Sequence, residues 1–288
     1  MDCFHPVYVK DQGIYVRCGR CPACLAYRQQ AWITRLLAQL QCSSNAYFVT
    51  LTYNDEHLHY QPAQYDFCGE LVSPRIAVPW KRDVQLFNKR LRKHIDSGFF
   101  EILGSRIPLP YSGKMSYYVV CELGPETLRP HYHGIYFNVA DDPFTAEDLI
   151  RSTWSKGFVQ VDECNAQTIS YVTKYLLQNK LLPDIPDYYP RPWALMSKGL
   201  GAALLTPALL DWWRENPTQR CYVPEHGTKK TLARYYKDKI FDDDMKARIA
   251  DKYASRMKPY EYDPEREHLQ QEYVRQRRNL LLKKSKLK

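Results

Sequence analysis

The sequence predicts an α+β domain, an antiparallel sheet with flanking helices, joined to a small N-terminal metal-binding module. Segments rich in Tyr, Val, Phe, Ile and Thr lie in the middle of the chain, which is typical of half-buried strands. Segments with hydrophobic residues every three or four positions alternate with them and indicate helices. Four of the nine cysteines crowd the first two dozen residues. A chain of 288 residues favours one main domain with smaller attachments.

The expected elements follow in order along the chain. A Cys-rich head leads into a helix at residues 25–41, which carries Trp32, Leu36 and Leu40 at helical spacing. The residue pattern gives four candidate strands, at residues 47–53, 116–123, 131–139 and 158–161. Further helices are expected from Asp83 onward and at residues 144–154 and 166–178. After the Pro-rich stretch at residues 182–193 the pattern weakens, and residues 275–288 form a strongly basic tail.

The helix from Asp83 combines a hydrophobic stripe with a basic face. The stripe consists of Val84, Phe87, Leu91 and Ile95, and the basic positions between them include Lys89, Arg90, Arg92 and Lys93. These four side chains, like the basic tail, are candidates for contacts with phosphates. A merely solvated face explains both features equally well.

Charge and hydropathy narrow the class of partner. Lys and Arg number 41 against 32 Asp and Glu, and the net charge of +9 favours a polyanion over a membrane surface. No segment approaches the roughly 20 apolar residues of a membrane-spanning helix, and the N-terminus lacks the apolar core of a signal peptide. The expected location is the cytosol, where thiolates bind metals more often than they form disulfides.

The cysteines of the head predict a structural Zn²⁺ site. Cys18, Cys21 and Cys24 have overlapping C-x-x-C spacing, and Cys3 is available as the fourth ligand, with His5 as its substitute. Such a site can fold a segment too short to have its own core. Reduced free thiols are the alternative. The remaining cysteines are scattered and are interpreted as packing residues: Cys42, Cys68, Cys121, Cys164 and Cys221.

Two histidines on one strand indicate a second metal site. Alternate strand residues point to the same face, so His131 and His133 can share one ion. The short connection after Glu122 folds the preceding strand back beside them, which brings a carboxylate to the pair. This mixed ligand set with open positions suits a catalytic divalent ion. The alternative is two ordinary strand histidines and a carboxylate at a strand end.

A tyrosine-rich helix face supplies candidate nucleophiles. Spacings of three and four residues place Tyr171, Lys174 and Tyr175 on one side of the expected helix, with Ile169, Val172 and Leu176 on the other. A phenol with a pKa near 10 is a poor nucleophile at neutral pH, so it needs a metal and a nearby cation. Chance spacing among 23 tyrosines remains the alternative.

Three segments together resemble the HUH endonucleases, and specifically the gokushovirus-type replication initiators of microviruses. They are FVTLTY at residues 48–53, ELGPETLRPHYH at residues 122–133 and SYVTKYLL at residues 170–177. The resemblance implies a sheet of five strands in an HUH endonuclease domain at residues 31–215, between a zinc-binding head at residues 1–30 and a basic extension at residues 216–288. One departure is Tyr132, which stands where the family usually has an aliphatic residue.

The resemblance also assigns roles to the candidate residues. His131 and His133, with Glu122 as third ligand, would bind Mg²⁺ or Mn²⁺, and Thr50 and Thr52 would support the site or the DNA. The two tyrosines would alternate as nucleophiles and Lys174 would be their basic neighbour.

The implied activity is rolling-circle initiation on single-stranded origin DNA through a 5′-phosphotyrosine. It would take place in the cytoplasm of an infected bacterium, together with the host replication machinery and without a membrane. A non-enzymatic zinc-containing nucleic-acid-binding protein is the first alternative. A phosphodiesterase that activates water in place of tyrosine is the second.

Overall fold

The computed structural model describes residues 3–110, 113–124, 128–181, 190, 193–225, 227–254 and 263–285. The chain forms two compact units. One comprises Met1–Gln39, Lys180–Leu182 and Gly201–Lys288, and the other comprises Leu40–Asn179 and Pro183–Leu200. We call them the terminal unit and the sheet unit. The three-part division expected from the sequence stays a prediction.

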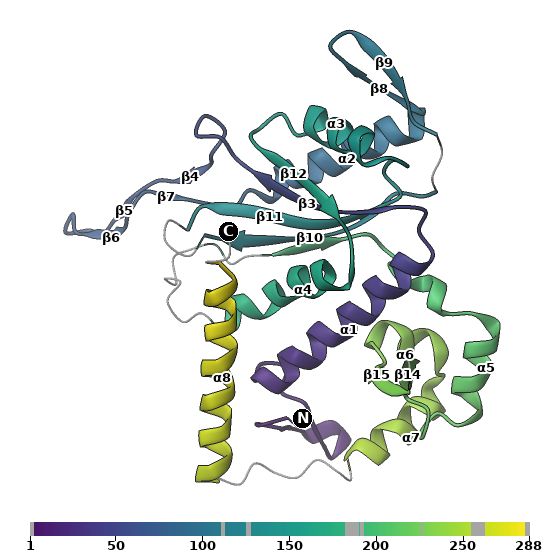
Figure 1. The fold of residues 1–288 in the computed structure, drawn as a ribbon. Helices are drawn as coiled ribbons and strands as arrows, with labels where there is room; N and C mark the ends of the chain where they lie inside the picture. The colour runs from purple at the N-terminus through teal and green to yellow at the C-terminus, as the bar shows by residue number, and fades with distance from the viewer. Residues whose placement is uncertain are drawn as a thin grey trace. The chain divides into compact units, whose positions relative to one another are not determined.

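The sheet unit is built on a five-stranded antiparallel sheet (Figure 1). Its order is β12-β3-β11-β10-β13, so β11 is central. The bounds are β3 Ala46–Thr52, β10 Ser116–Leu123, β11 Pro130–Phe137, β12 Val159–Glu163 and β13 Ala194–Met196. The four strands predicted from composition are confirmed. The fifth, β13, has only three residues and follows the Pro-rich stretch, most of which lies outside the described residues, so local pattern did not reveal it.

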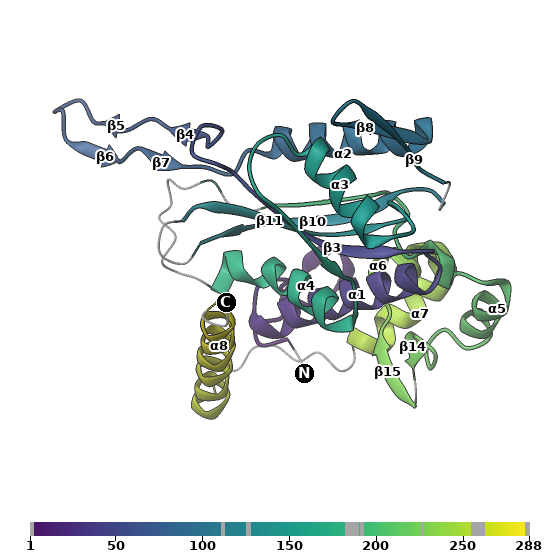
Figure 2. The same cartoon turned by 45° about the horizontal axis from the view of Figure 1, so that its top comes forward.

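Helices cover both faces of this sheet. Helices α2 (Lys81–Ser97) and α3 (Pro143–Thr153) lie on one face, and α4 (Ala166–Leu181) lies on the other (Figures 1 and 2). All three predicted helices are confirmed. The hydrophobic stripe of α2 packs on one set of alternate strand residues, which belong to the same buried cluster: Tyr47, Val49, Leu51, Val119, Cys121, Tyr132 and Tyr136. The other set of alternate residues therefore faces α4.

Short antiparallel ribbons extend from the sheet unit. Strand β4 (Tyr60–Gln61) pairs with β7 (Ile76–Ala77), and β5 (Gln64–Tyr65) pairs with β6 (Leu71–Ser73). A separate hairpin joins β8 (Phe99–Ile102) to β9 (Ser105–Pro108). None of these ribbons was predicted, because two to four residues are too few to show a strand period.

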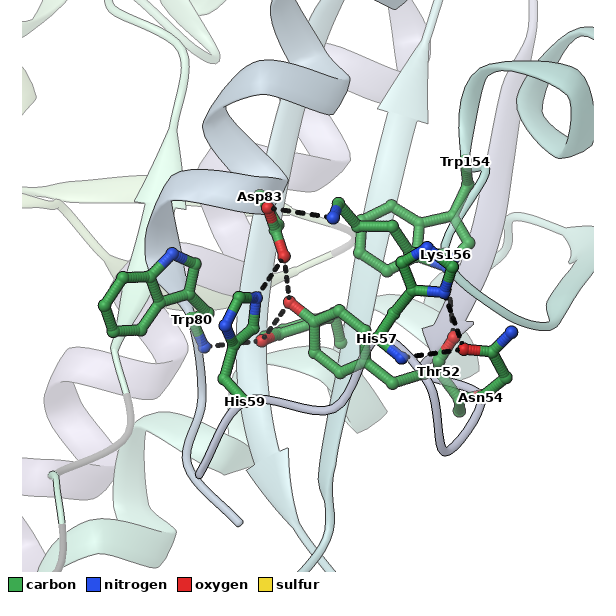
Figure 3. A network of polar contacts seen from close by, with 10 residues as sticks. Thr52, Asn54, His57, His59, Trp80, Asp83, Trp154 and Lys156 are labelled. Carbon is green, nitrogen blue, oxygen red and sulfur yellow. Dashed lines mark hydrogen bonds and ion pairs between the residues drawn. The ribbon is translucent and has the colours of Figure 1, made fainter. Parts of the chain in front are cut away.

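A buried polar network fixes the end of β3 on the α2 face (Figure 3). Asp83, in the first turn of α2, accepts a hydrogen bond from the Tyr53 hydroxyl at 2.9 Å. His59 Nε2 lies 2.7 Å from the same carboxylate, and Lys156 Nζ lies 3.5 Å from it. Three loops far apart in the sequence thus meet at one carboxylate. No sequence pattern indicated this network, since its members share no motif.

The loop that carries Lys156 needs a glycine for its close approach. The Asn54 amide donates to the Lys156 carbonyl oxygen at 3.0 Å. A Cβ on Gly157, whose φ is +155°, would lie 2.2 Å from the Thr52 carbonyl oxygen. Only glycine allows the two backbones to lie this close together.

The terminal unit is mainly helical. It contains β1 Val7–Val9, η1 Lys10–Gln12, β2 Ile14–Val16, α1 Pro22–Gln41, η2 Ala202–Leu204, α5 Pro207–Glu215, β14 Tyr222–Glu225, β15 Thr228–Thr231, α6 Arg234–Ile240, α7 Asp243–Ala254 and α8 Pro264–Ser285. Its core gathers around Trp213 and Tyr236, both fully buried. The segment after the Pro-rich stretch therefore has a core of its own, which its weak sequence pattern had not indicated. Among the described helices, none is long and apolar enough to cross a membrane.

Candidate active site

Strand register brings the predicted metal ligands to one face of the sheet. His131 lies directly opposite Glu122 on β10 and opposite Thr52 on β3, and His133 lies opposite Thr50. Residues directly opposite each other in an antiparallel pair project to the same side. All five side chains therefore lie on the face that α4 covers.

His133 is held by both of its ring nitrogens. Its Nε2 lies 2.6 Å from Glu122 Oε2, and its Nδ1 lies 3.0 Å from Thr50 Oγ1. Burial alone would raise the pKa of Glu122, but the hydrogen bond and charge of His133 outweigh it and hold that pKa below its ordinary value. The ionised carboxylate can only accept, so Nε2 carries the proton and Nδ1 accepts from the Thr50 hydroxyl. The predicted supporting role of Thr50 thus has a definite contact.

Helix α4 places both candidate nucleophiles against this histidine. The Tyr175 ring stacks on His133 at a centroid distance of 5.4 Å, and the Tyr171 ring meets it edge-on at 5.5 Å. Tyr175 is 2% exposed, whereas Tyr171 is only partly buried. The i, i+4 spacing thus brings two phenols to a single imidazole. Ile169 and Val172 are buried, and the side chain of Leu176 lies outside the described residues.

Lys174 lies over the tyrosine rings. Its Nζ is 3.8 Å from the Tyr171 ring centroid and 4.8 Å from that of Tyr175. Burial and then the negative charge of Glu122 raise the pKa of both tyrosine hydroxyls. The nearby ammonium therefore does not by itself produce a phenolate in this site.

The donor set suits a hard divalent ion. Two imidazoles and one carboxylate offer nitrogen and oxygen ligands and leave coordination positions for substrate oxygens. In the described part of the chain, however, the only group of three or more His, Cys, Asp or Glu ligand atoms within 4.8 Å of one another is the cysteine set. His131, His133 and Glu122 share a face without meeting that spacing, so joint binding stays a prediction.

The basic helix predicted to contact DNA lies on the opposite side of the sheet. Lys89 and Lys93 on α2 are exposed, Arg90 donates to the Thr153 carbonyl oxygen at 3.3 Å, and Arg92 lies 6.0 Å from the Tyr117 ring centroid. The structure does not bring these four residues to the tyrosines, and their contact with phosphates stays a prediction. Of the basic tail at residues 275–288, the side chains beyond residue 276 lie outside the described part.

The four head cysteines form the predicted group. The Sγ atoms of Cys3, Cys18, Cys21 and Cys24 all lie within 4.8 Å of one another, so they could hold one ion such as Zn²⁺. Cys24 lies in the first turn of α1, which begins at Pro22, three residues earlier than predicted. Backbone amides of Arg20 and Cys21 lower the pKa of Cys18 to about 7 against the opposing effect of burial. Thiolates are the form that binds metals.

The packing interpretation of the other cysteines holds for three of them. Cys121, Cys164 and Cys221 are buried, but Cys42 and Cys68 are exposed, so for these two the interpretation is wrong. Both lie in short segments beside turns, where no hydrophobic period identified the buried side.

Sequence reasoning also missed one member of the site. The Phe48 ring stacks on His133 at 5.7 Å and meets the Tyr171 ring edge-on at 5.8 Å. Strand alternation from Thr50 would have placed Phe48 on the same face.

Family comparison covers this part of the chain. The model of a family described as replication-associated proteins of the ORF2 type matches residues 46–180. That segment runs from the start of β3 into α4, and it contains all of the candidate ligands and nucleophiles. The head cysteines lie outside it.

Three phage proteins are similar over a longer stretch. Replication-associated protein VP4 of Bdellovibrio phage phiMH2K is 26% identical over 77% of this chain and 66% of its own length. Replication-associated protein ORF2 of Spiroplasma virus 4 is 29% identical, over 83% of this chain and 70% of its own. Replication-associated protein ORF4 of Chlamydia phage 1 is 23% identical, over 61% and 41%. No solved structure matches the chain. The resemblance to phage replication proteins indicated by the three motifs is confirmed.

Proposed function

We propose that this chain, a relative of the replication-associated proteins of small phages, initiates rolling-circle replication by nicking single-stranded origin DNA. In the proposed reaction a tyrosine of α4 attacks a phosphodiester and becomes joined to the 5′-phosphate. The first relative named above is matched over 66% of its length, and its name gives a role in replication only.

One observation carries the proposal: two tyrosines of one helix lie against a histidine that is hydrogen-bonded to a carboxylate. The ring centroids of Tyr171 and Tyr175 are 5.2 Å apart, and each lies within about 5.5 Å of the His133 ring. Neither alternative function requires this arrangement. A zinc-containing binding protein has no use for paired phenols beside an imidazole, and a hydrolase that activates water needs no tyrosine.

The proposed transesterification conserves the bond that it breaks. The phenol oxygen of Tyr171 or Tyr175 bonds to phosphorus, and the bond from phosphorus to the 3′ oxygen breaks. The phenol gives up one proton and the released 3′ oxygen takes up one, so no net proton is consumed. The 3′-hydroxyl can prime synthesis. A second attack by the other tyrosine, followed by return of a 3′-hydroxyl to the first adduct, would yield a circle.

The residues of the sheet prepare this step. A divalent ion held by His131, His133 and Glu122 would polarise the phosphate and offset the Glu122 charge that disfavours phenolate. If His133 gives its Nε2 lone pair to the ion, the ring proton moves to Nδ1. The Thr50 hydroxyl at 3.0 Å can then accept where it formerly donated, because a hydroxyl does both.

Covalent capture tests the proposal. The full chain is incubated with 5′- and 3′-labelled single-stranded origin DNA and Mn²⁺ or Mg²⁺, and the products are separated on a denaturing gel. We expect the 3′-labelled fragment to migrate with the protein. Tyr171→Phe combined with Tyr175→Phe should abolish the adduct and retain the fold, because Phe keeps both rings.

Histidine variants separate the alternatives. His131→Ala or His133→Ala should lower nicking by a factor of about 10² or more. His268→Ala, an exposed histidine of α8, serves as the control and should have no effect. Nicking without an adduct in the wild-type protein would favour activated water instead. Binding without nicking would favour the non-enzymatic alternative.

A further inference from the structure

The terminal unit contains a pocket that lies outside the segment matched by the family model. It has a volume of about 310 Å³. Four arginines and three aromatic residues line it, with Cys24, Gly19, Ala31 and Ala233 completing the wall: Arg17, Arg28, Arg35, Arg234, Tyr27, Trp32 and Tyr235. We call it the arginine pocket. No Asp or Glu is among its lining residues, so its field is positive.

One face of helix α1 forms most of the wall. Cys24, Arg28, Ala31 and Arg35 recur every three or four residues and therefore form a stripe along the helix. From position 24 to position 35 this stripe is about 16 Å long at 1.5 Å per residue. The wall opposite comes from Ala233 to Tyr235, at the start of α6. The lining residues therefore describe a pocket that is elongated along α1.

Cations alternate with aromatic rings in this wall. The Arg35 guanidinium carbon lies 4.3 Å from the Trp32 ring centroid and 4.1 Å from that of Tyr235, so it is held between two rings. The Arg17 guanidinium carbon lies 5.0 Å from the Tyr27 ring centroid. Trp32 and Tyr235 are only partly buried, and Arg28 and Arg234 are exposed. Arg234 has one acidic neighbour, Asp238, at 3.6 Å.

We propose that the arginine pocket binds a short run of single-stranded DNA, with phosphates against the arginines and a base against Trp32 or Tyr235. Grooves that bind single strands without reading sequence combine a positive backbone track with aromatic stacking platforms. A free nucleotide offers the same phosphate and base. The elongated stripe of α1 favours a strand, because a single nucleotide would leave most of it unused. The choice of DNA over RNA rests on the proposed nicking function.

The head cysteines give the pocket its rigidity. Cys24 lines the wall itself, and Arg17 directly precedes Cys18 in sequence. An ion held by Cys3, Cys18, Cys21 and Cys24 would fix the start of α1 to the segment that carries Arg17. The pocket thus gives the zinc module a purpose in the proposed function that is separate from catalysis.

The test measures binding in a chain that cannot form the covalent adduct. The full chain with Tyr171→Phe and Tyr175→Phe is titrated into a fluorescein-labelled oligo(dT), and anisotropy is recorded over a range of NaCl concentrations. Arg28→Ala with Arg234→Ala should weaken binding at least tenfold. It should also reduce the slope of log K against log salt by about 1.4, at roughly 0.7 per phosphate contact.

Matched controls separate the pocket from general charge. Lys10→Ala with Arg248→Ala removes the same charge from exposed positions of the same unit outside the pocket and should change affinity less than twofold. Trp32→Phe should retain binding, and Trp32→Leu should weaken it roughly tenfold because a stacking platform is lost. Thermal unfolding of both Trp32 variants checks that the fold persists.

Three outcomes would overturn the proposal. They are equal affinities for the two arginine double variants, equal affinities for the two Trp32 variants at unchanged unfolding temperature, and displacement of the oligonucleotide by micromolar dATP. Inorganic phosphate at the same concentration should not compete. A chain that binds through the pocket but never forms an adduct with origin DNA would remove the nicking proposal and leave the pocket standing.

Discussion

The Nε2 atom of His133 lies 2.6 Å from Oε2 of Glu122, inside a site where the two side chains are 3% and 14% exposed. They come from neighbouring strands and are bonded to each other in this geometry. Two ligand atoms at about 2.1 Å on adjacent octahedral positions of one ion lie about 3 Å apart. The pair therefore needs to separate by only a few tenths of an ångström to admit an ion between them.

The two tyrosines should differ in their contribution to the first cleavage. Tyr171 is partly exposed and Tyr175 is 2% exposed, so DNA reaches the Tyr171 hydroxyl with less rearrangement. We expect Tyr171→Phe to slow the first cleavage at least about tenfold more than Tyr175→Phe, roughly 1.4 kcal/mol in activation free energy. Single-turnover rates of adduct formation measure this difference. Equal rates would mean that exposure does not decide the order.

Asp83 should matter for stability but not for chemistry. Its carboxylate gathers Tyr53, His59 and Lys156 on the face opposite the tyrosines (Figure 3). Asp83→Ala removes hydrogen bonds to a charged group and should lower the free energy of unfolding by about 1.5–3 kcal/mol. Chemical denaturation measures it.

An exposed ion pair provides the control for Asp83. Glu147→Ala breaks the pair with Arg151 on α3, where both partners are solvent-accessible, and should cost less than about 1 kcal/mol. Adduct formation at 25 °C should survive in both variants. Loss of the adduct in a folded Asp83→Ala protein would show that this network also positions the active site.

The cysteine group should bind one zinc ion per chain. Cys21→Ser removes one of four thiolates, so zinc content should fall, and the unfolding temperature of the terminal unit should drop by roughly 5–10 °C. Cys42→Ser changes an exposed cysteine outside the group and should leave both quantities unchanged. Metal analysis by mass spectrometry together with calorimetry checks the prediction. A purified wild-type chain without zinc would contradict it.

Asp142 should make α3 sensitive to acid. Its side chain caps the helix by accepting from the Thr145 amide at 2.8 Å, and hydrogen bonds from Thr145 lower its pKa. A lowered pKa means that this stabilisation is present above the unfolded value near 3.9 and is lost as pH falls through the folded value.

Two substitutions of Asp142 isolate the charge from the cap. Asp142→Ala should cost about 1 kcal/mol at pH 7 and much less near pH 2. Asp142→Asn keeps a capping oxygen without a titrating group, so its stability relative to the alanine variant should vary little between these pH values. Unfolding curves measured across that range test both. A constant difference between wild type and Asp142→Ala would rule out the carboxylate as the cause.

Local periodicity predicted the elements that are long and the residues that repeat. The four longest strands of the sheet and helices α1 to α4 each carry a period that a single segment reveals. The C-x-x-C spacing predicted the cysteine group, because three of its four ligands are close in sequence. Strand alternation likewise predicted that His131 and His133 share a face.

Other features had no local signal. Strand β13 has three residues, and the core around Trp213 assembles from short helices distant in the chain. The arginine pocket combines α1 with residues 233–235, about two hundred positions later. No single window of sequence contains both walls.

The sequence by itself determined the candidate chemistry of this protein: which residues can ligate, which can attack, and on which face of a helix or strand each one lies. Those properties follow from side-chain type and from periods of two or 3.6 residues, which are local. Only the tertiary structure decided which faces meet. It placed α4, and not the basic helix α2, over His133, and it bonded Glu122 to that histidine. Contacts between distant segments depend on how the whole core packs, and that information is not held in any one segment.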